Sequence, residues 1–175
     1  MVTVPRVEMA DVLELVNTYG RVPRATAQDQ GEGYPALSAV MADNAERFPG
    51  TELEHLQALA DEAYQVFAAA HEGGDVADRV NALLAPASPT PTCTPECGIE
   101  WEVADAADAL RAALGVALLD FLHTRGAERL GTCKGIRCAD AFADLSPSGR
   151  KLFCSSGCLN RHKVAEHRRR AKASA

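Results

Sequence analysis

Residues 133–158 read CKGIRCADAFADLSPSGRKLFCSSGC, and four cysteines mark this stretch in two pairs. Cys133 and Cys138 are separated by four residues, and Cys154 and Cys158 by three, with fifteen residues between the pairs. Each short loop presents two sulfurs to the same ion, and four thiolates suit tetrahedral zinc with Zn–S distances of about 2.3 Å. We therefore expect one structural Zn²⁺ ion held by Cys133, Cys138, Cys154 and Cys158.

Other interpretations of the cysteines are less favourable. A pair of disulfides would need an oxidising compartment, whereas a cytosolic chain keeps its thiols reduced. Four sulfurs leave no open position for water, so a catalytic ion is not expected. His162 and His167 lie downstream and could compete as ligands, but four thiolates already complete the shell. Cys93 and Cys97 lie in a proline-rich segment, and we expect two free thiols there with no assigned role.

The residues around the cysteines predict a small zinc module. Gly135 permits the tight bend inside the first pair. Residues 139–154 are expected to form a β-hairpin that turns at residues 146–149. Residues 159–173 contain no proline or glycine and are expected to form a helix, with Cys158 in its opening turn. Knuckle, hairpin and helix in this order are the layout of a treble-clef module, and the metal is expected to supply much of its folding energy.

The charge of the chain is divided unevenly. Residues 1–120 contain 6 Lys and Arg against 20 Asp and Glu, a net charge of −14, whereas residues 121–175 contain 12 against 4, a net charge of +8. An acidic body with a basic tail indicates a negatively charged partner, and nucleic acid is the commonest one. The alternative is that the tail pairs with an acidic protein surface, and charge alone does not separate the two.

The last predicted helix concentrates the basic residues. At 100° per residue, Arg161, Arg168 and Lys172 share one face, and a narrow opposite seam that could pack on the hairpin contains Asn160, Val164 and Ala171. Arginine pairs with phosphates and guanine, asparagine pairs with adenine, and the lack of aromatic residues argues against single-strand stacking. We therefore expect double-stranded DNA as the partner, contacted by Asn160, Arg161, Lys163, Arg168, Arg169, Arg170 and Lys172.

Composition favours a mainly α fold for the rest of the chain. Of the 175 residues, 47% are hydrophobic, which suffices for a core, and only 5% are aromatic, which disfavours a β-sandwich or barrel. No apolar run approaches the roughly 18 residues of a membrane span. The N-terminus lacks the basic start and apolar stretch of a signal peptide. We therefore expect a cytoplasmic protein that does not enter a membrane.

Hydrophobic periodicity predicts the individual elements of this helical body. Residues 20–33 are expected to form a polar loop, and residues 89–94 and 99–103 a short β-hairpin. Thr51 and Glu54 have the spacing of a capping box at a helix start. Helices are expected over residues 7–19, 35–45, 51–72, 75–84 and 105–125.

The sequence is expected to divide into two domains. Residues 1–127 would form a helical domain that senses a ligand or forms a homodimer, and residues 128–175 the zinc module. A pocket for an anionic small-molecule effector could be bounded by four residues beside the predicted loop, Asn17, Tyr19, Arg21 and Arg24. The sequence contains no evident nucleophile–base pair, Gly-rich phosphate loop or open metal site, so no catalytic residue is assigned and we do not expect an enzyme.

Residues 133–170 resemble the CGNR zinc-finger family, in which a C-x4-C knuckle and a short hairpin precede a second cysteine pair, an Asn-Arg dipeptide and a basic helix. The dipeptide here is Asn160-Arg161, and Leu159 replaces the family's glycine. Residues 15–20, LVNTYG, resemble the opening of the helical domain that precedes this finger. The resemblance implies a bacterial transcription regulator related to stress responses, with zinc and DNA bound by the finger.

Two functional hypotheses follow from the sequence. In the first, the chain is a transcription regulator in which a structural zinc ion holds a basic helix that contacts DNA. In the second, it is a protein-interaction or small-ligand-binding protein, the zinc module is only a structural clasp, and the basic tail pairs with acidic protein surface. Salt-sensitive binding to DNA favours the first hypothesis. Protection of the tail from proteolysis without DNA favours the second.

Overall fold

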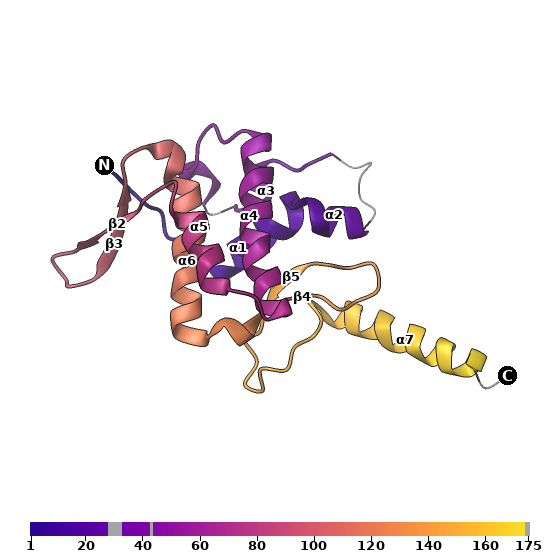
Figure 1. Cartoon of the computed structure of the whole chain (residues 1–175). Coiled ribbons are helices and arrows are strands. Elements are labelled where there is room, and N and C mark those ends of the chain that lie inside the picture. The colour runs from indigo at the N-terminus through magenta and orange to yellow at the C-terminus, as the bar shows by residue number, and fades with distance from the viewer. Residues whose placement is uncertain (28–32, 43, 174–175) are drawn as a thin grey trace.

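The computed structural model describes residues 1–27, 33–42 and 44–173 of the chain. Within these ranges the fold is mainly helical, as predicted, with two small antiparallel sheets (Figure 1). The helices are α1 (Met9–Tyr19), α2 (Arg21–Ala27), α3 (Leu37–Val40), α4 (Leu53–Glu72), α5 (Val76–Leu84), α6 (Ala109–Arg125) and α7 (Ser156–Ala173). The strands are β1 (Val2–Thr3), β2 (Thr90–Cys93), β3 (Ile99–Val103), β4 (Leu130–Thr132) and β5 (Ala141–Ala143). No helix in these described ranges is long and apolar enough to cross a membrane.

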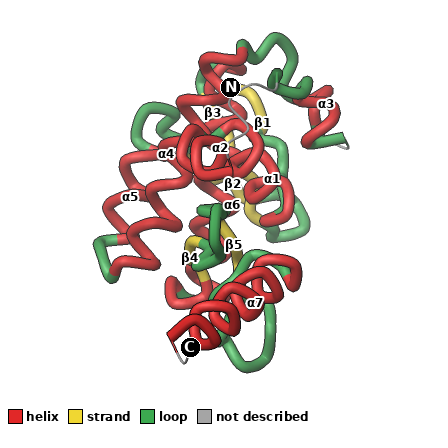
Figure 2. Tube along the Cα trace, turned by 90° about the vertical axis from the view of Figure 1, so that its right-hand side faces the viewer, coloured by secondary structure: helices red, strands yellow, loops and turns green. Residues whose placement is uncertain are grey.

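Helix α6 contributes many residues to the core of the body. Ala112, Leu114 and Leu118 on this helix have no exposed surface, which is the burial that a broad apolar face requires. The helix packs against α1, α4 and α5, and α4 and α5 run side by side (Figure 2). The predicted helices over residues 7–19, 51–72, 75–84 and 105–125 therefore occur as α1, α4, α5 and α6.

The polar loop predicted over residues 20–33 is wrong in its first half, where α2 forms instead. Pro23 is the third residue of α2, and in the first turn of a helix its missing N–H breaks no helical hydrogen bond. Gly20 lets α1 and α2 meet closely, because a Cβ there would lie 2.4 Å from the carbonyl oxygen of Val16. Residues 28–32 of the predicted loop lie outside the described residues.

Two helix starts also differ from the prediction. The helix expected from Pro35 is reduced to the four residues of α3, because the chain then turns and buries Met41 completely. Helix α4 begins at Leu53, and Thr51 does not cap it. The hydroxyl of Thr51 donates instead to the carbonyl oxygen of Phe48 at 3.0 Å, so it stabilises the preceding turn.

The hairpin predicted from residues 89–94 and 99–103 is confirmed as β2 and β3. These strands pair antiparallel, with Thr90 opposite Glu102, and β1 adds to the other side of β3 to give the order β1-β3-β2. The hairpin and α7 project from opposite sides of the body (Figure 1). Cys93 and Cys97 are exposed free thiols on this hairpin, as expected.

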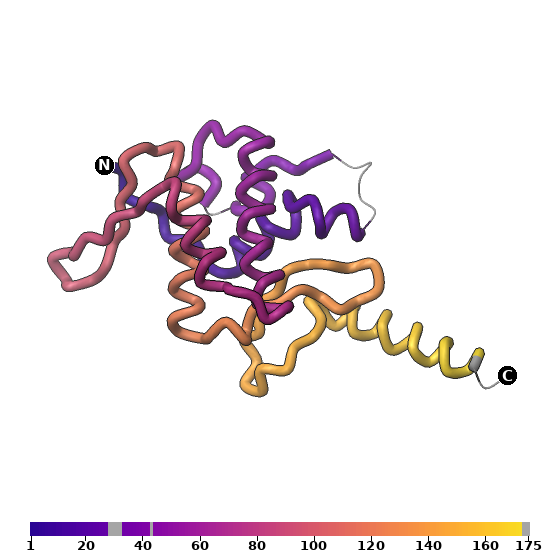
Figure 3. The backbone as a smooth tube through the Cα atoms, in the orientation of Figure 1, coloured from indigo at the N-terminus to yellow at the C-terminus, as the bar shows by residue number. Residues whose placement is uncertain are grey.

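The prediction of a hairpin over residues 139–154 is wrong, because the strand at residues 141–143 pairs with a different segment. Strand β5 pairs with β4, which precedes the first cysteine, so the first cysteine pair lies in the loop of the β4–β5 hairpin (Figure 3). Ala141 and Ala143 of β5 pack into the same hydrophobic cluster as the helices. Leu145 and Leu152 are 65% and 51% exposed and join no such cluster, which explains why no strand forms there. The boundary at residue 128 stays a prediction.

Candidate metal centre

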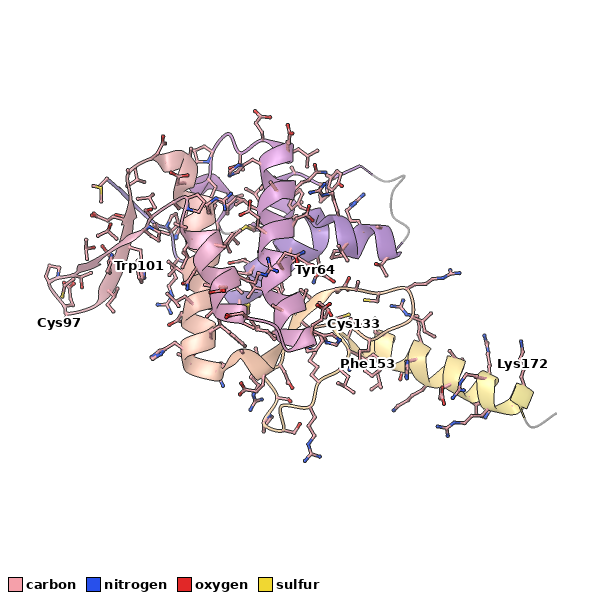
Figure 4. The ribbon with its side chains drawn as sticks, viewed as in Figure 1. Tyr64, Cys97, Trp101, Cys133, Phe153 and Lys172 are labelled. Carbon is pink, nitrogen blue, oxygen red and sulfur yellow. The ribbon has the colours of Figure 1, made fainter. Side chains whose placement is uncertain are left out.

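Three elements bring the four cysteines together. Cys133 follows β4, Cys138 precedes β5, Cys154 precedes α7, and Cys158 is the third residue of α7. Their four Sγ atoms all lie within 4.8 Å of one another, and in Figure 4 Cys133 lies near the start of α7. A tetrahedral ion with Zn–S bonds of about 2.3 Å places its sulfurs about 3.8 Å apart. The Sγ atom of Cys154 lies 3.6 Å from that of Cys138 and 3.5 Å from that of Cys158.

All four cysteines are free thiols rather than disulfides, and three of them are buried. Four sulfurs gathered this closely fit a single structural zinc ion. When bound, such an ion cross-links the knuckle to the start of α7. Four thiolates already complete its shell, and the ring of His162 lies instead against Phe153, with 5.1 Å between ring centroids.

Backbone and glycine geometry shape the first knuckle around Cys133. The N–H groups of Gly135 and Cys154 both donate to Sγ of Cys133 at 3.3 Å, which stabilises negative charge on this sulfur. A Cβ at Gly135 would lie 3.1 Å from Cβ of Cys158 and 3.2 Å from Sγ of Cys133. Position 135 therefore suits glycine because a side chain would crowd two of the ligands.

Arg161 belongs to this centre. Its Nη2 atom donates to Sγ of Cys158 at 2.9 Å, one helical turn away. Burial raises the pKa of Cys158, but hydrogen bonds from Ser155, from the neighbouring sulfurs and from Arg161 outweigh burial and lower it to about 7. The sequence predicts only a DNA contact for Arg161, because residue spacing cannot show which way an arginine on a helix turns.

The other two perturbed thiols favour their protonated forms. Burial raises the pKa of Cys138, and burial also raises the pKa of Cys154 to about 12. Zinc binding displaces thiol protons, because only the thiolate is a ligand. Asp140 accepts a hydrogen bond from Sγ of Cys154 at 3.3 Å, so a carboxylate stands beside this cluster.

Two side chains of the helical body hold the backbone immediately after Cys138. Asn17 of α1 donates from Nδ2 to the carbonyl oxygen of Ala141 at 3.1 Å and accepts from its N–H at 2.7 Å. The hydroxyl of Tyr64 in α4 donates to the carbonyl oxygen of Ala139 at 2.9 Å. The metal centre is therefore fixed to the body by specific hydrogen bonds as well as by apolar packing.

The remaining residues of the predicted effector pocket have partners inside the protein. Tyr19 is fully buried, its hydroxyl donates to the carbonyl oxygen of Pro35 at 2.8 Å, and its ring stacks on Tyr34 with centroids 6.1 Å apart. The guanidinium of Arg24 lies over the Tyr34 ring, 4.1 Å from its centroid, and Arg21 forms an ion pair with Asp61. These contacts, with Asn17 bound to β5, give all four residues structural roles. The effector pocket stays a prediction.

A buried carboxylate orders the loop between β5 and the second cysteine pair. Asp144 is only 2% exposed and accepts from the backbone N–H groups of Ser146 at 2.9 Å and of Lys151 at 2.8 Å. Hydrogen bonds from Ser146 and Lys151 lower the pKa of Asp144 to about 2. Periodicity missed this residue, because an aspartate in a polar loop ordinarily faces solvent.

Helix α7 extends away from the body beyond its first turns (Figures 1 and 4). The seven residues predicted to contact DNA are all exposed. The predicted packing seam is wrong: Val164 is 50% exposed, and the half-buried side is instead the one that carries His162. Glu166 pairs with Arg169 and Arg170 within the helix, and these arginines lower its pKa to about 2.

These features define a class of protein in which a helical body is followed by a four-cysteine zinc finger. The model of the CGNR zinc finger matches residues 129–171. A second family model, described as "Putative stress-induced transcription regulator", matches residues 11–145, which is more than half of the chain. The chain belongs to this family, and the resemblance seen in the sequence is confirmed. A search of curated proteins found no match.

Proposed function

We propose that this protein is a transcription regulator that binds double-stranded DNA through α7, with zinc holding the root of that helix. The observation that carries the proposal is the contrast along α7. Cys158 at its start is buried in the metal centre, whereas every residue from His167 to Lys172 is exposed, and this exposed part is rich in arginine and lysine.

The dimensions of α7 support this role. An α-helix with its side chains is about 10–12 Å wide, and the major groove of B-DNA is about 12 Å wide. The 18 residues of α7 give a length of about 27 Å, and the part beyond its first turns stands clear of the body (Figure 1). The helix therefore has the width and length that fit the major groove of DNA.

The charge of the finger supports a polyanionic partner even when the metal centre is counted. Four thiolates and one Zn²⁺ ion together contribute two negative charges, which reduces the formal +8 of residues 121–175 to +6. Arg169 and Arg170 share the charge of Glu166, so part of the cationic charge is already balanced within α7. The remaining positive charge favours phosphate contacts.

The test is binding of the zinc-loaded full chain to a pool of genomic fragments, followed by a salt titration with the selected duplex. The affinity is expected to fall steeply with salt, with a log–log slope of about −0.9 for each phosphate neutralised. A truncation that ends at Leu159 keeps the four cysteines and is expected to lose binding. Failure of the full chain to bind any duplex at low salt would overturn the proposal.

The charge division also supports a second candidate, a protein-interaction role in which α7 pairs with an acidic surface of another subunit. Limited proteolysis separates the two candidates: an occupied α7 is protected without DNA, and an unoccupied one is cleaved until DNA is added. In both, we propose that the protein is not an enzyme, since the four-sulfur zinc shell has no open position for a substrate or water.

A further inference from the structure

A groove runs between the first cysteine knuckle and α7. On the knuckle side it is lined by Ile136 and Arg137, and on the helix side by Asn160, Val164, Arg168 and Lys172. Ala27 at the end of α2 lines it as well. Ile136 and Val164 are 47% and 50% exposed, so the groove has apolar surface as well as cationic side chains. The sequence alone predicts no role for Arg137, because this residue lies outside the basic helix.

We propose that this groove holds one strand of the DNA backbone, with Arg137 on one wall and the face of α7 that carries Arg168 and Lys172 on the other. The proposal rests on the proposed function and specifies which residues of the finger contact the phosphates. A helix in the major groove lies between two sugar–phosphate backbones, and the groove beside α7 receives one of them. Ile136 and Val164 then contact the sugars, and the cations contact the phosphates.

The two sides of α7 are not equivalent in this geometry. At about 100° per residue, Arg168 and Lys172 project within about 40° of each other toward the groove, whereas Lys163 projects from nearly the opposite side. When α7 lies in the major groove of DNA, the side that carries Lys163 faces the second backbone, so Lys163 is not a control for this groove. Arg79 of α5 is exposed on the helical body and is used as the control instead.

Arg161 and Asp140 also line the groove, and they reduce its positive charge near the metal centre. Arg161 donates to Sγ of Cys158, so its charge is partly balanced by that ligand. Asp140 accepts from Sγ of Cys154 at the inner end of the groove. The backbone contact is therefore expected at the outer part, where Arg137, Arg168 and Lys172 are exposed.

The backbone at Arg137 provides an independent observation. Its φ angle is +55°, in the left-handed region that glycine adopts freely and that other residues adopt at a cost in free energy. The knuckle thus carries an exposed guanidinium at a position where glycine would be less strained. A strained backbone that presents a charged side chain toward a groove supports a binding role for that side chain.

The experiment compares Arg137→Gly, Arg137→Lys and Arg79→Gln with the wild-type full chain, all zinc-loaded, in salt titrations on one duplex selected from genomic DNA. Arg137→Gly is expected to keep or raise the denaturation midpoint and yet to reduce the magnitude of the salt slope by about 0.9. Arg137→Lys is expected to preserve the slope because it preserves the charge. Arg79→Gln is expected to leave the slope unchanged, because Arg79 lies on α5 of the helical body.

The outcomes distinguish this inference from the function on which it rests. If the wild type binds DNA and Arg137→Gly has the slope of the wild type, the groove does not hold the backbone. Equal losses for Arg137→Gly and Arg79→Gln would also overturn the inference, because the slope would then follow the total charge of the chain and not the groove. If the wild type binds no duplex, the proposed function fails and this inference fails with it.

Discussion

The side chain of Asn17 in α1 binds the backbone of Ala141 in β5 at two points, across 124 residues of sequence. It satisfies both the N–H and the carbonyl oxygen of this residue, as a neighbouring strand would do. Among the residues that the structure describes, strand β5 has a partner strand on one side only, β4. Asn17 therefore links the helical body to the sheet that carries the first cysteine pair.

Replacement of Asn17 by alanine is expected to destabilise the zinc-loaded protein by about 1–3 kcal/mol, because it leaves two backbone groups of Ala141 without their partner. The measurement is the free energy of unfolding from urea denaturation. Asn81→Ala, at an exposed position of α5, is the control and is expected to change stability by about 0.5 kcal/mol or less. Equal stabilities of the Asn17 and Asn81 variants would contradict the structural link.

Removal of zinc is expected to weaken the helical body as well as the finger. Tyr64 and Asn17 join the body to the segment after Cys138, and Leu130 of β4 lies in the hydrophobic cluster of the helices. Trp101 packs against that same cluster on the distant β-hairpin, so its fluorescence reports on the body (Figure 4). Chelation is expected to lower the denaturation midpoint seen by Trp101. An unchanged midpoint would mean that the finger unfolds independently.

Arg161→Gln is expected to weaken zinc retention by about tenfold, because partners that hydrogen-bond to a metal ligand typically affect metal affinity by about 10–100-fold. The measurement is the zinc affinity from competition with a coloured chelator. Lys163→Gln, two residues further along the helix, is expected to retain zinc as the wild type does. If Arg161→Gln lost DNA binding and kept normal zinc affinity, Arg161 would act on DNA alone.

Asp144→Asn is expected to destabilise the loop between β5 and Cys154. The lowered pKa of Asp144 means that its ionised form stabilises the fold above its ordinary pKa near about 4, and this contribution is lost as the pH falls toward 2. At neutral pH the asparagine variant is expected to lose about 1–3 kcal/mol of stability. Asp120→Asn, on an exposed position of α6, is the control for urea denaturation.

Long periodic elements could be predicted from the sequence because their residues carry the information locally. Helix α6 repeats apolar residues at helical spacing. Around Trp101, apolar residues alternate with glutamates, and this alternation predicts β3. The four cysteines are a strong signal for the same reason, since a metal needs its ligands at short, fixed separations.

The predictions that were wrong concern elements whose structure depends on contacts with residues far away in the sequence. Helix α2 has a proline and little apolar content, so nothing local distinguishes it from a loop. Strand β5 is three residues long and is stabilised by β4, α1 and α4. Asn17 was assigned to a pocket because its partner, Ala141, is 124 residues away and has no side-chain chemistry to reveal the pairing.

The anchoring of α7 at one end makes the metal centre a pivot and the helix a lever arm. Lys172 lies fourteen residues beyond Cys158, about 21 Å along the helix axis. A tilt of about 10° at the pivot displaces that end by about 3.7 Å, which is close to the 3.4 Å step between successive base pairs. The coordination angles at four sulfurs therefore set the register in which the far end of the helix would meet a duplex.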